Sequence, residues 1–256
     1  MGTLCDNLLK LITQKFDQRR NIKDVEWNLI RYYNNNVLEK ASENSTLVKL
    51  DQEIQQQKTE IEDLEVQINQ VAYQILNSPL CLLSIPNVSK PYLRRLARAR
   101  TILEEMEEGQ SEFERGGVDT AWMEVQRALE LLKLDSEITL SDRALAWLFQ
   151  AVVLARQHHY EEARQSVEQS FEYFSEQDQT RRMVARLIQG NIYSASSTGR
   201  IFEGQNAYSD ALWRLEKLSI QEAERGNQLK AELYRVLKEQ LQQKLAKPRE
   251  WKTTKS

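Results

Sequence analysis

Residues 163–170 read ARQSVEQS, and within them Ala163, Val167 and Ser170 follow a spacing that occurs three times in this chain. A small residue is followed four positions later by an apolar residue, and three positions after that by a second small residue. The other two copies are Ala121–Val125–Ala128 and Gly204–Tyr208–Ala211. The copies begin 42 and 41 positions apart. A fixed period of this length is typical of stacked helical repeats, so it decides how the rest of the chain is interpreted.

The spacing within each copy predicts pairs of antiparallel helices. Two packed helices need small residues where their backbones approach and larger residues that fill the adjacent groove. We expect each triplet on the second helix of a pair, after turns at Gly116-Gly117-Val118, His158-His159-Tyr160 and Gly199. Residues 218–245 would then form a terminal helix that closes the stack.

At these positions the chain resembles the tetratricopeptide repeat family. The matching residues are Gly109, Gly116, Ala121 and Ala128; Trp147, Ala151, Tyr160 and Ala163; and Gly190, Tyr193, Gly199, Gly204, Tyr208 and Ala211. Standard units of that family repeat about every 34 residues. The longer period here is closer to the units of some bacterial regulators and of kinesin light chains. The resemblance implies a superhelical stack whose first helices line a concave groove for a peptide or helix.

The first helix of the middle pair shows how such a groove could be used. Residues 144–155 are apolar around the whole helix, which must therefore be covered on every side. The residues expected to face the groove are Leu145, Leu148, Val152, Val184, Leu187, Asn191 and Ser194. Three interpretations stay open: a partner helix fills the groove, this chain's own N-terminal helices fill it, or the residues form ordinary packing between repeats. Ordinary packing is favoured for Phe149 and Val153.

Residues 45–78 carry a different pattern, an apolar heptad repeat. Its two seam positions are occupied by Leu47, Leu50, Ile54, Ile61, Leu64, Ile68, Val71 and Ile75. An apolar period of 3.5 residues sustained over four heptads is typical of a coiled coil. The same stripe would serve a homodimer of two chains or an antiparallel hairpin with residues 1–42.

These patterns divide an all-α chain into four regions. Only 8 Gly and 4 Pro interrupt its 256 residues, which favours helices throughout. Pro79, Pro86 and Pro91 mark one clear break. We expect a helical or coiled-coil region at 1–78, a proline-containing joint at 79–91, helical repeats with a terminal helix at 92–245, and a basic flexible tail at 246–256.

The charge pattern offers one possible anion-binding patch, at Arg94, Arg95 and Arg98. A glutamate-rich segment follows at once, so ion pairs such as Arg100–Glu104 are expected to neutralise part of the patch. The net charge of the chain is −3, which also argues against nucleic acid as a partner. A solvated helix is the favoured interpretation.

The remaining sequence features limit the possible functions. No apolar run reaches the length of a membrane span, and Asp6 and Lys10 argue against a signal peptide. We therefore expect a cytoplasmic protein whose two cysteines, Cys5 and Cys81, are reduced. No catalytic, metal-binding or cofactor motif occurs, so we expect no enzyme and no cofactor. The favoured function is a protein–protein interaction adaptor, scaffold or assembly chaperone. The alternative is a signal-responsive regulator whose repeats sense a peptide and whose N-terminal helices act on a target.

Overall fold

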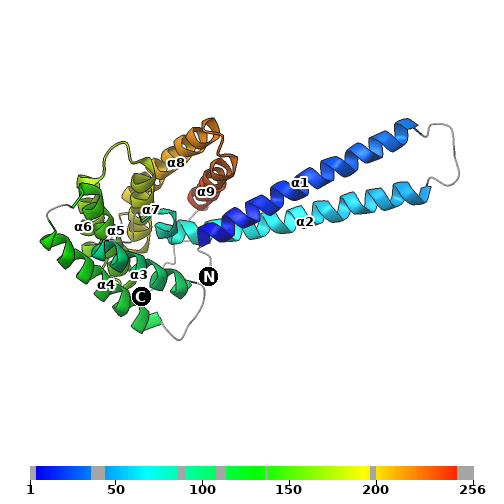
Figure 1. Ribbon diagram of the computed structural model, residues 1–256. Helices are drawn as coiled ribbons and strands as arrows, with labels where there is room; N and C mark the ends of the chain where they lie inside the picture. The colour runs from blue at the N-terminus through cyan, green and yellow to red at the C-terminus, as the bar shows by residue number, and fades with distance from the viewer. Residues whose placement is uncertain are drawn as a thin grey trace, which may run out of the picture.

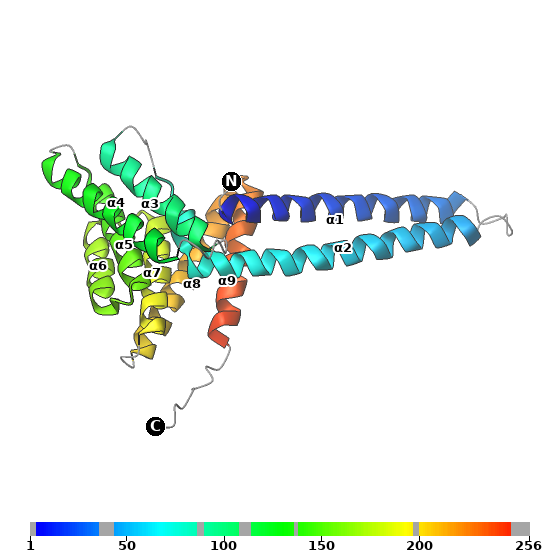
Figure 2. The same cartoon turned by 90° about the horizontal axis from the view of Figure 1, so that it is seen from below.

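The computed structural model describes residues 4–35, 44–85, 90–107, 114–135, 138–196 and 200–246. Within these ranges every regular element is a helix, which confirms the all-α prediction. Helices α1 (Leu4–Asn35) and α2 (Asn44–Asn77) run antiparallel and project as a long hairpin from a body that contains all other elements (Figures 1 and 2).

Within a single chain, the predicted heptad stripe of α2 packs against α1. Ile54, Ile68, Val71 and Ile75 are buried, whereas the remaining seam residues, Leu47, Leu50, Ile61 and Leu64, are half-buried. Polar contacts also cross the pair: Gln18 Nε2 donates to Glu60 Oε2 at 2.8 Å. The intramolecular hairpin thus accounts for the stripe, and a homodimer through it stays a prediction.

The body is built from consecutive helix pairs. Helix α3 (Pro91–Glu107) packs on α4 (Glu114–Leu134), α5 (Leu140–Arg156) on α6 (Tyr160–Tyr173), and α7 (Gln179–Ala195) on α8 (Ile201–Glu224). Helix α9 (Gln228–Ala246) packs on α8 and on the base of the hairpin. All nine triplet residues lie on α4, α6 and α8, the second helix of each pair, and all nine are buried. The spacing therefore marks the close contacts between paired helices.

Two predicted boundaries are wrong, and one turn is confirmed. Gly116 and Gly117 lie inside α4, where a Cβ on Gly117 would come within 2.9 Å of Met106 Sδ. Gly117 thus permits close helix packing and makes no turn. Helix α8 continues to Glu224, so residues 218–224 belong to it and not to the terminal helix. The turn at His158 is confirmed, whereas Gly109, Gly199 and residues 247–256 lie outside the described residues.

Side chains at the helix ends explain where the first helices of two pairs begin. Thr139 Oγ1 accepts a hydrogen bond from the backbone N–H of Asp142 at the start of α5, at 3.1 Å. Asp178 Oδ1 accepts one from the N–H of Arg181 at the start of α7, at the same distance. Such caps satisfy backbone donors that have no partner inside the helix.

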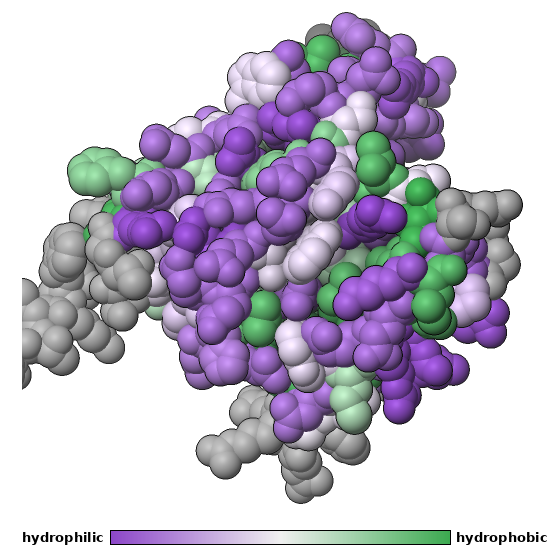
Figure 3. Space-filling model, turned by 90° about the vertical axis from the view of Figure 1, so that its left-hand side faces the viewer, coloured by the Kyte–Doolittle hydropathy of each residue, from purple (hydrophilic) through white to green (hydrophobic). Residues whose placement is uncertain are grey.

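The hairpin and the body share one hydrophobic core. Leu8 and Ile12 of α1 and Ala72 and Ile75 of α2 belong to the same cluster of buried residues as the helix pairs. The distal part of the hairpin lies outside this cluster and exposes Trp27 and other large apolar side chains. The end of the body formed by α4, α5 and α6 is mainly hydrophilic, with small groups of hydrophobic residues (Figure 3). No helix in the described part of the chain has the length and apolar character needed to span a membrane.

Candidate functional site

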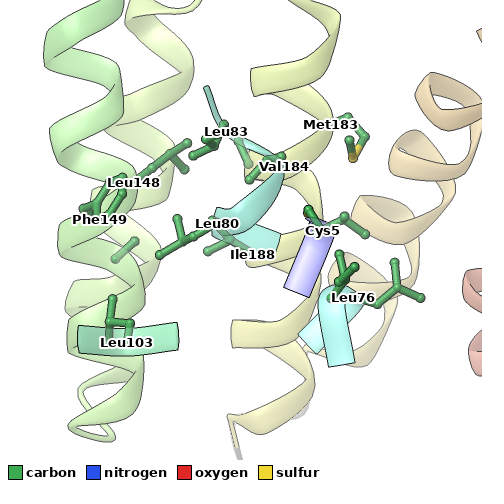
Figure 4. Packing of buried hydrophobic residues seen from close by; sticks show 14 of the residues in the cluster. Cys5, Leu76, Leu80, Leu83, Leu103, Leu148, Phe149, Met183, Val184 and Ile188 are labelled. Atoms are coloured by element: carbon green, nitrogen blue, oxygen red, sulfur yellow. The ribbon is translucent and has the colours of Figure 1, made fainter. Parts of the chain in front are cut away.

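We call the face formed by α5 and α7, the first helices of the second and third pairs, the inner face. A short segment that follows the hairpin covers it. Helix α2 ends at Asn77, and a single 3-10 turn, η1 (Pro79–Leu82), follows it. Proline suits this first position because it needs no backbone donor there. Leu80 and Leu83 are each 1% exposed. They lie between Leu148 of α5 and Val184 of α7 (Figure 4). We call residues 79–83 the η1 segment.

The residues expected to face an open groove are mostly covered. Leu145, Leu148, Val184 and Leu187 have no exposed surface. Val152, Asn191 and Ser194 are half-buried. This chain itself covers the face, through the η1 segment of the predicted joint, the end of α2 and the packing of α5 on α7. Binding of a separate partner at these residues stays a prediction.

Asn191 ties the end of α2 to the repeat body. Its Nδ2 donates to the carbonyl oxygens of Leu76 and Asn77 at 2.9 and 3.2 Å. Its Oδ1 accepts hydrogen bonds from Tyr208 Oη at 2.7 Å and from Lys244 Nζ at 3.0 Å. Carbonyl groups at a helix C-terminus lack partners within the helix. Asn191 therefore caps α2 from more than 100 residues away in sequence, as the separation of 115 positions to Leu76 shows.

Arg100 holds the other end of the η1 segment. Its Nη1 donates to the carbonyl oxygen of Leu83 at 3.0 Å, and its Nε lies 3.6 Å from Glu104 Oε1. The predicted Arg100–Glu104 pair is thus confirmed, but the hydrogen bond to Leu83 was not expected. The end of α2 just before the segment and Leu83 at its far end are both hydrogen-bonded to the body, and its leucines are buried. The segment is therefore an integral part of the fold.

A cavity remains beside the segment, between α5, α6 and α7. Its volume is about 150 Å³. Most of its lining is apolar, and its polar members come from α2, α5, α6 and α7. The lining residues are Asn77, Ser78, Pro79, Leu80, Val152, Ala155, Arg156, Tyr160, Ile188, Asn191, Ile192 and Ala195. Among the predicted groove residues, Val152 and Asn191 line it, so they are the two that a ligand in this cavity would contact.

A second polar cluster joins α3 to α5. Tyr92 Oη donates to Asp142 Oδ2 at 2.9 Å, and Lys90 Nζ lies 3.8 Å from the same oxygen. Burial raises the pKa of Tyr92 above its ordinary value, so the phenol keeps the proton that it donates. The cluster links the start of α3 to α5, and so the first helix pair to the second.

Of the three arginines in the predicted anion patch, Arg95 is paired with a carboxylate. Arg95 Nη1 donates to both carboxylate oxygens of Glu124 on α4, at 3.0 Å each. Arg94 and Arg98 are exposed. Because its central guanidinium is paired with a carboxylate, the patch offers less positive charge than the sequence suggests. An anion site at these residues stays a prediction.

The fold brings together the two cysteines that the sequence separates. Cys5 lies in the first turn of α1 and is buried, and Cys81 lies in η1 and is partly exposed. Helix α1 and η1 are in contact, and the neighbouring Cys5, together with burial, raises the pKa of the Cys81 thiol well above its ordinary value. Neither cysteine was expected to have a cysteine neighbour, because no sequence period relates residues 5 and 81. Within the described residues, no group of three or more His, Cys, Asp and Glu side chains is arranged to hold a metal ion.

Comparison with known proteins yields no match: no family model matches the chain, and neither a curated protein nor a solved structure is detectably similar to it.

Proposed function

We propose that this chain is a protein–protein interaction adaptor or scaffold that binds a peptide or helix of another protein on the inner face of its repeats. The observation that carries the proposal is the η1 segment. The inner face already holds a short apolar segment, with Leu80 and Leu83 buried between α5 and α7. Arg100 bonds to the carbonyl of Leu83, and Asn191 holds the end of α2 just before the segment. Repeat stacks use such extended inner surfaces for binding.

We expect the proposed partner to bind at the cavity beside the η1 segment. A volume of about 150 Å³ accommodates one or two apolar side chains. Asn77 and Asn191 also line the cavity, where the hydrogen bond between them holds the end of α2. A partner that inserts an apolar side chain between Val152 and Ile188 would extend the packing that Leu80 begins.

A substitution that places a charged side chain in the cavity, at a position outside the core, tests this proposal. Ala195 lines the cavity and is exposed, so Ala195→Lys should leave the fold intact. Ala223 is exposed near the end of α8 and is not among the cavity residues, which makes Ala223→Lys the matched control.

Wild-type protein and both variants would be used for affinity capture from the native organism, with mass spectrometry of the retained proteins. The proposal predicts a partner that wild type and Ala223→Lys retain equally and that Ala195→Lys loses at least tenfold. If all three proteins retain the same partners to the same extent, the cavity is not the binding site.

The position of the hairpin favours a second candidate, a signal-responsive regulator. The η1 segment connects directly to α2, and Asn191 holds the end of α2. A peptide that displaced the segment would therefore also release the hairpin base. This candidate predicts faster amide hydrogen exchange in residues 68–77 when the partner is bound, whereas a simple adaptor leaves that exchange unchanged.

A further inference from the structure

A second cavity lies between α5 and α6, and the proposed function makes no use of it. Its volume is about 530 Å³, and it shares no lining residue with the cavity beside the η1 segment. We call it the acidic cavity, because three of its nine lining residues are glutamates and none is basic. The lining residues are Trp147, Gln150, Leu154, Glu162, Gln165, Ser166, Glu168, Gln169 and Glu172.

The charge of the acidic cavity is only partly balanced by the protein itself. Arg164 Nη1 lies 2.6 Å from Glu168 Oε1, and the same guanidinium also pairs with Glu161, which lies outside the lining. Glu172 accepts a hydrogen bond from the neutral amide of Gln169 at 3.4 Å. With three carboxylates in the lining and one arginine divided between Glu161 and Glu168, the cavity keeps an excess of negative charge.

The aromatic ring of Trp147 lies at the same end of the cavity as two of the carboxylates. Residues 157–159 join α5 to α6, so the two helices run antiparallel. Trp147, in the first half of α5, therefore lies beside the last turns of α6, which carry Glu168 and Glu172. Its side chain is partly exposed. The face of an indole ring attracts a cation more strongly than that of any other side chain.

Gln150 adds a hydrogen-bond acceptor to this end of the cavity. It lies one turn after Trp147 on α5 and lines the cavity. Its Oε1 atom is buried and accepts no hydrogen bond from the described residues. A buried acceptor without a donor is costly, and in folded proteins such atoms are few. A ligand that brings N–H donors into the cavity would remove this cost.

We propose that the acidic cavity binds the guanidinium group of an arginine from a basic segment of another protein. A guanidinium is planar, so it stacks on Trp147 while its N–H groups donate to Glu172 and to Gln150 Oε1. A lysine ammonium has the same charge but no planar face for stacking, so arginine is preferred. Glu162 lies about 15 Å from Glu172 along α6 and would meet a second basic side chain of the same segment.

The probe is the peptide acetyl-Ala-Arg-Ala-Ala-Arg-Ala-amide, added to the full chain with ¹⁵N-labelled tryptophan. Trp147→Phe assigns the indole resonance of Trp147. That resonance should shift to saturation with the arginine peptide. The same peptide with citrulline, a neutral group of similar shape, should bind at least tenfold more weakly, and a lysine peptide at least threefold more weakly. Added salt should weaken binding, because the carboxylates are close to solvent.

Two variants place the binding at the acidic cavity. Glu172 is exposed, so Glu172→Gln should fold normally and bind the arginine peptide at least fivefold more weakly. Glu224→Gln, exposed at the end of α8 and outside the lining, is the matched control and should bind as wild type does. Melting temperatures establish that both variants are folded.

Three results would overturn this proposal: equal affinity for the arginine and citrulline peptides, equal binding by the two variants, or no shift of the Trp147 resonance. The outcome is independent of the proposed function. Ala195→Lys changes only the cavity beside the η1 segment, so it should leave the affinity for the arginine peptide unchanged.

Discussion

Tyr208 fills the space that a Cβ at Gly190 would need. The ideal Cβ position lies 2.4 Å from Tyr208 Cε1, and the same tyrosine donates the hydrogen bond that orients Asn191. The lack of a side chain at Gly190 therefore has two effects. It lets α7 and α8 pack closely, and it positions the group that caps α2.

Gly190→Ala should destabilise the protein by about 1–3 kcal/mol, because Tyr208 must move and the surrounding core is closely packed. The free energy of unfolding in urea measures this change. Gly116→Ala is the control, since no atom lies within 4 Å of its added Cβ. This exposed helical position should tolerate alanine or gain up to about 1 kcal/mol. If the two substitutions changed the free energy of unfolding equally, the close approach of Tyr208 to Gly190 would be contradicted.

His158 occupies a backbone conformation that favours glycine. Its φ is 63°, and it follows the end of α5. The N–H of His159 donates to the carbonyl of Leu154 at 2.9 Å, and the N–H of His158 donates to that of Ala155 at 3.1 Å. This is the Schellman arrangement that glycine usually completes. At the end of α8 the corresponding residue is Gly226, with φ of 81°.

His158→Gly should therefore stabilise the chain, by about 1 kcal/mol, because it removes the cost of a left-handed conformation with a Cβ. Thermal unfolding followed by circular dichroism measures the change. Gly226→Ala is the opposite substitution at the equivalent position and should lower stability by a similar amount. His158 Nδ1 lies within hydrogen-bond distance of Tyr160 Oη, at 2.9 Å. A lower melting temperature for His158→Gly would mean that this contact outweighs the backbone strain.

At the scale of elements, ion pairs contribute to the alignment of α1 with α2. Lys15 Nζ lies 2.8 Å from Glu65 Oε1, and Arg19 Nη2 lies 3.2 Å from the same oxygen. The hydrogen bond with Lys15 lowers the pKa of Glu65. A carboxylate with a lowered pKa stabilises the fold at neutral pH, and that contribution is lost as pH falls through its folded-state pKa.

Protonation of Glu65 should loosen the hairpin in acid. Because its side chain is 42% exposed, the contribution is below about 1 kcal/mol. Glu65→Gln should reduce stability at pH 7 and should weaken its decline below about pH 4.5, the ordinary pKa of a glutamate. Urea unfolding at a series of pH values measures this, with exposed Glu62→Gln as the control. Identical pH profiles for the two variants would contradict the role of Glu65.

The elements themselves follow closely from the sequence, but the way they meet does not. Local spacing predicts the helix pairs, since small residues such as Ala163 recur where helices touch. The heptad stripe predicts that α2 has a partner, but it is the same for a homodimer and a hairpin. The end of α8 was missed because the Schellman turn at Gly226 is a single-residue signal.

The candidate site depended on contacts between distant residues. Asn191 was predicted to face the groove, but its hydrogen bond to Leu76 spans 115 positions and follows no period. Arg100 was predicted to pair with Glu104, but its hydrogen bond to the carbonyl oxygen of Leu83 follows from no charge pattern. A sequence pattern indicates that side chains such as Asn191 and Arg100 need a partner. Their partners become known only from the position of the η1 segment and the end of α2 in the fold.

At the scale of the whole molecule, the hairpin base, the η1 segment and the repeat body form one core. Leu80→Ala should therefore destabilise the entire chain, by about 2–5 kcal/mol, because it leaves a cavity where three parts meet. Urea unfolding followed by circular dichroism measures this loss. Leu134→Ala, at a position that is 84% exposed, is the control and should change stability little. A loss confined to α1 and α2 would mean that the hairpin folds separately.

The most direct test of the central claim is a methyl nuclear Overhauser measurement on the chain with labelled Leu, Val and Ile methyl groups. If the η1 segment occupies the inner face of the repeats, Leu80 methyl groups will show cross-peaks to Ile188, and Leu83 methyl groups to Val184. Leu80 resonances with random-coil shifts and no cross-peaks to α7 would contradict the account, because the inner face would then be open in solution.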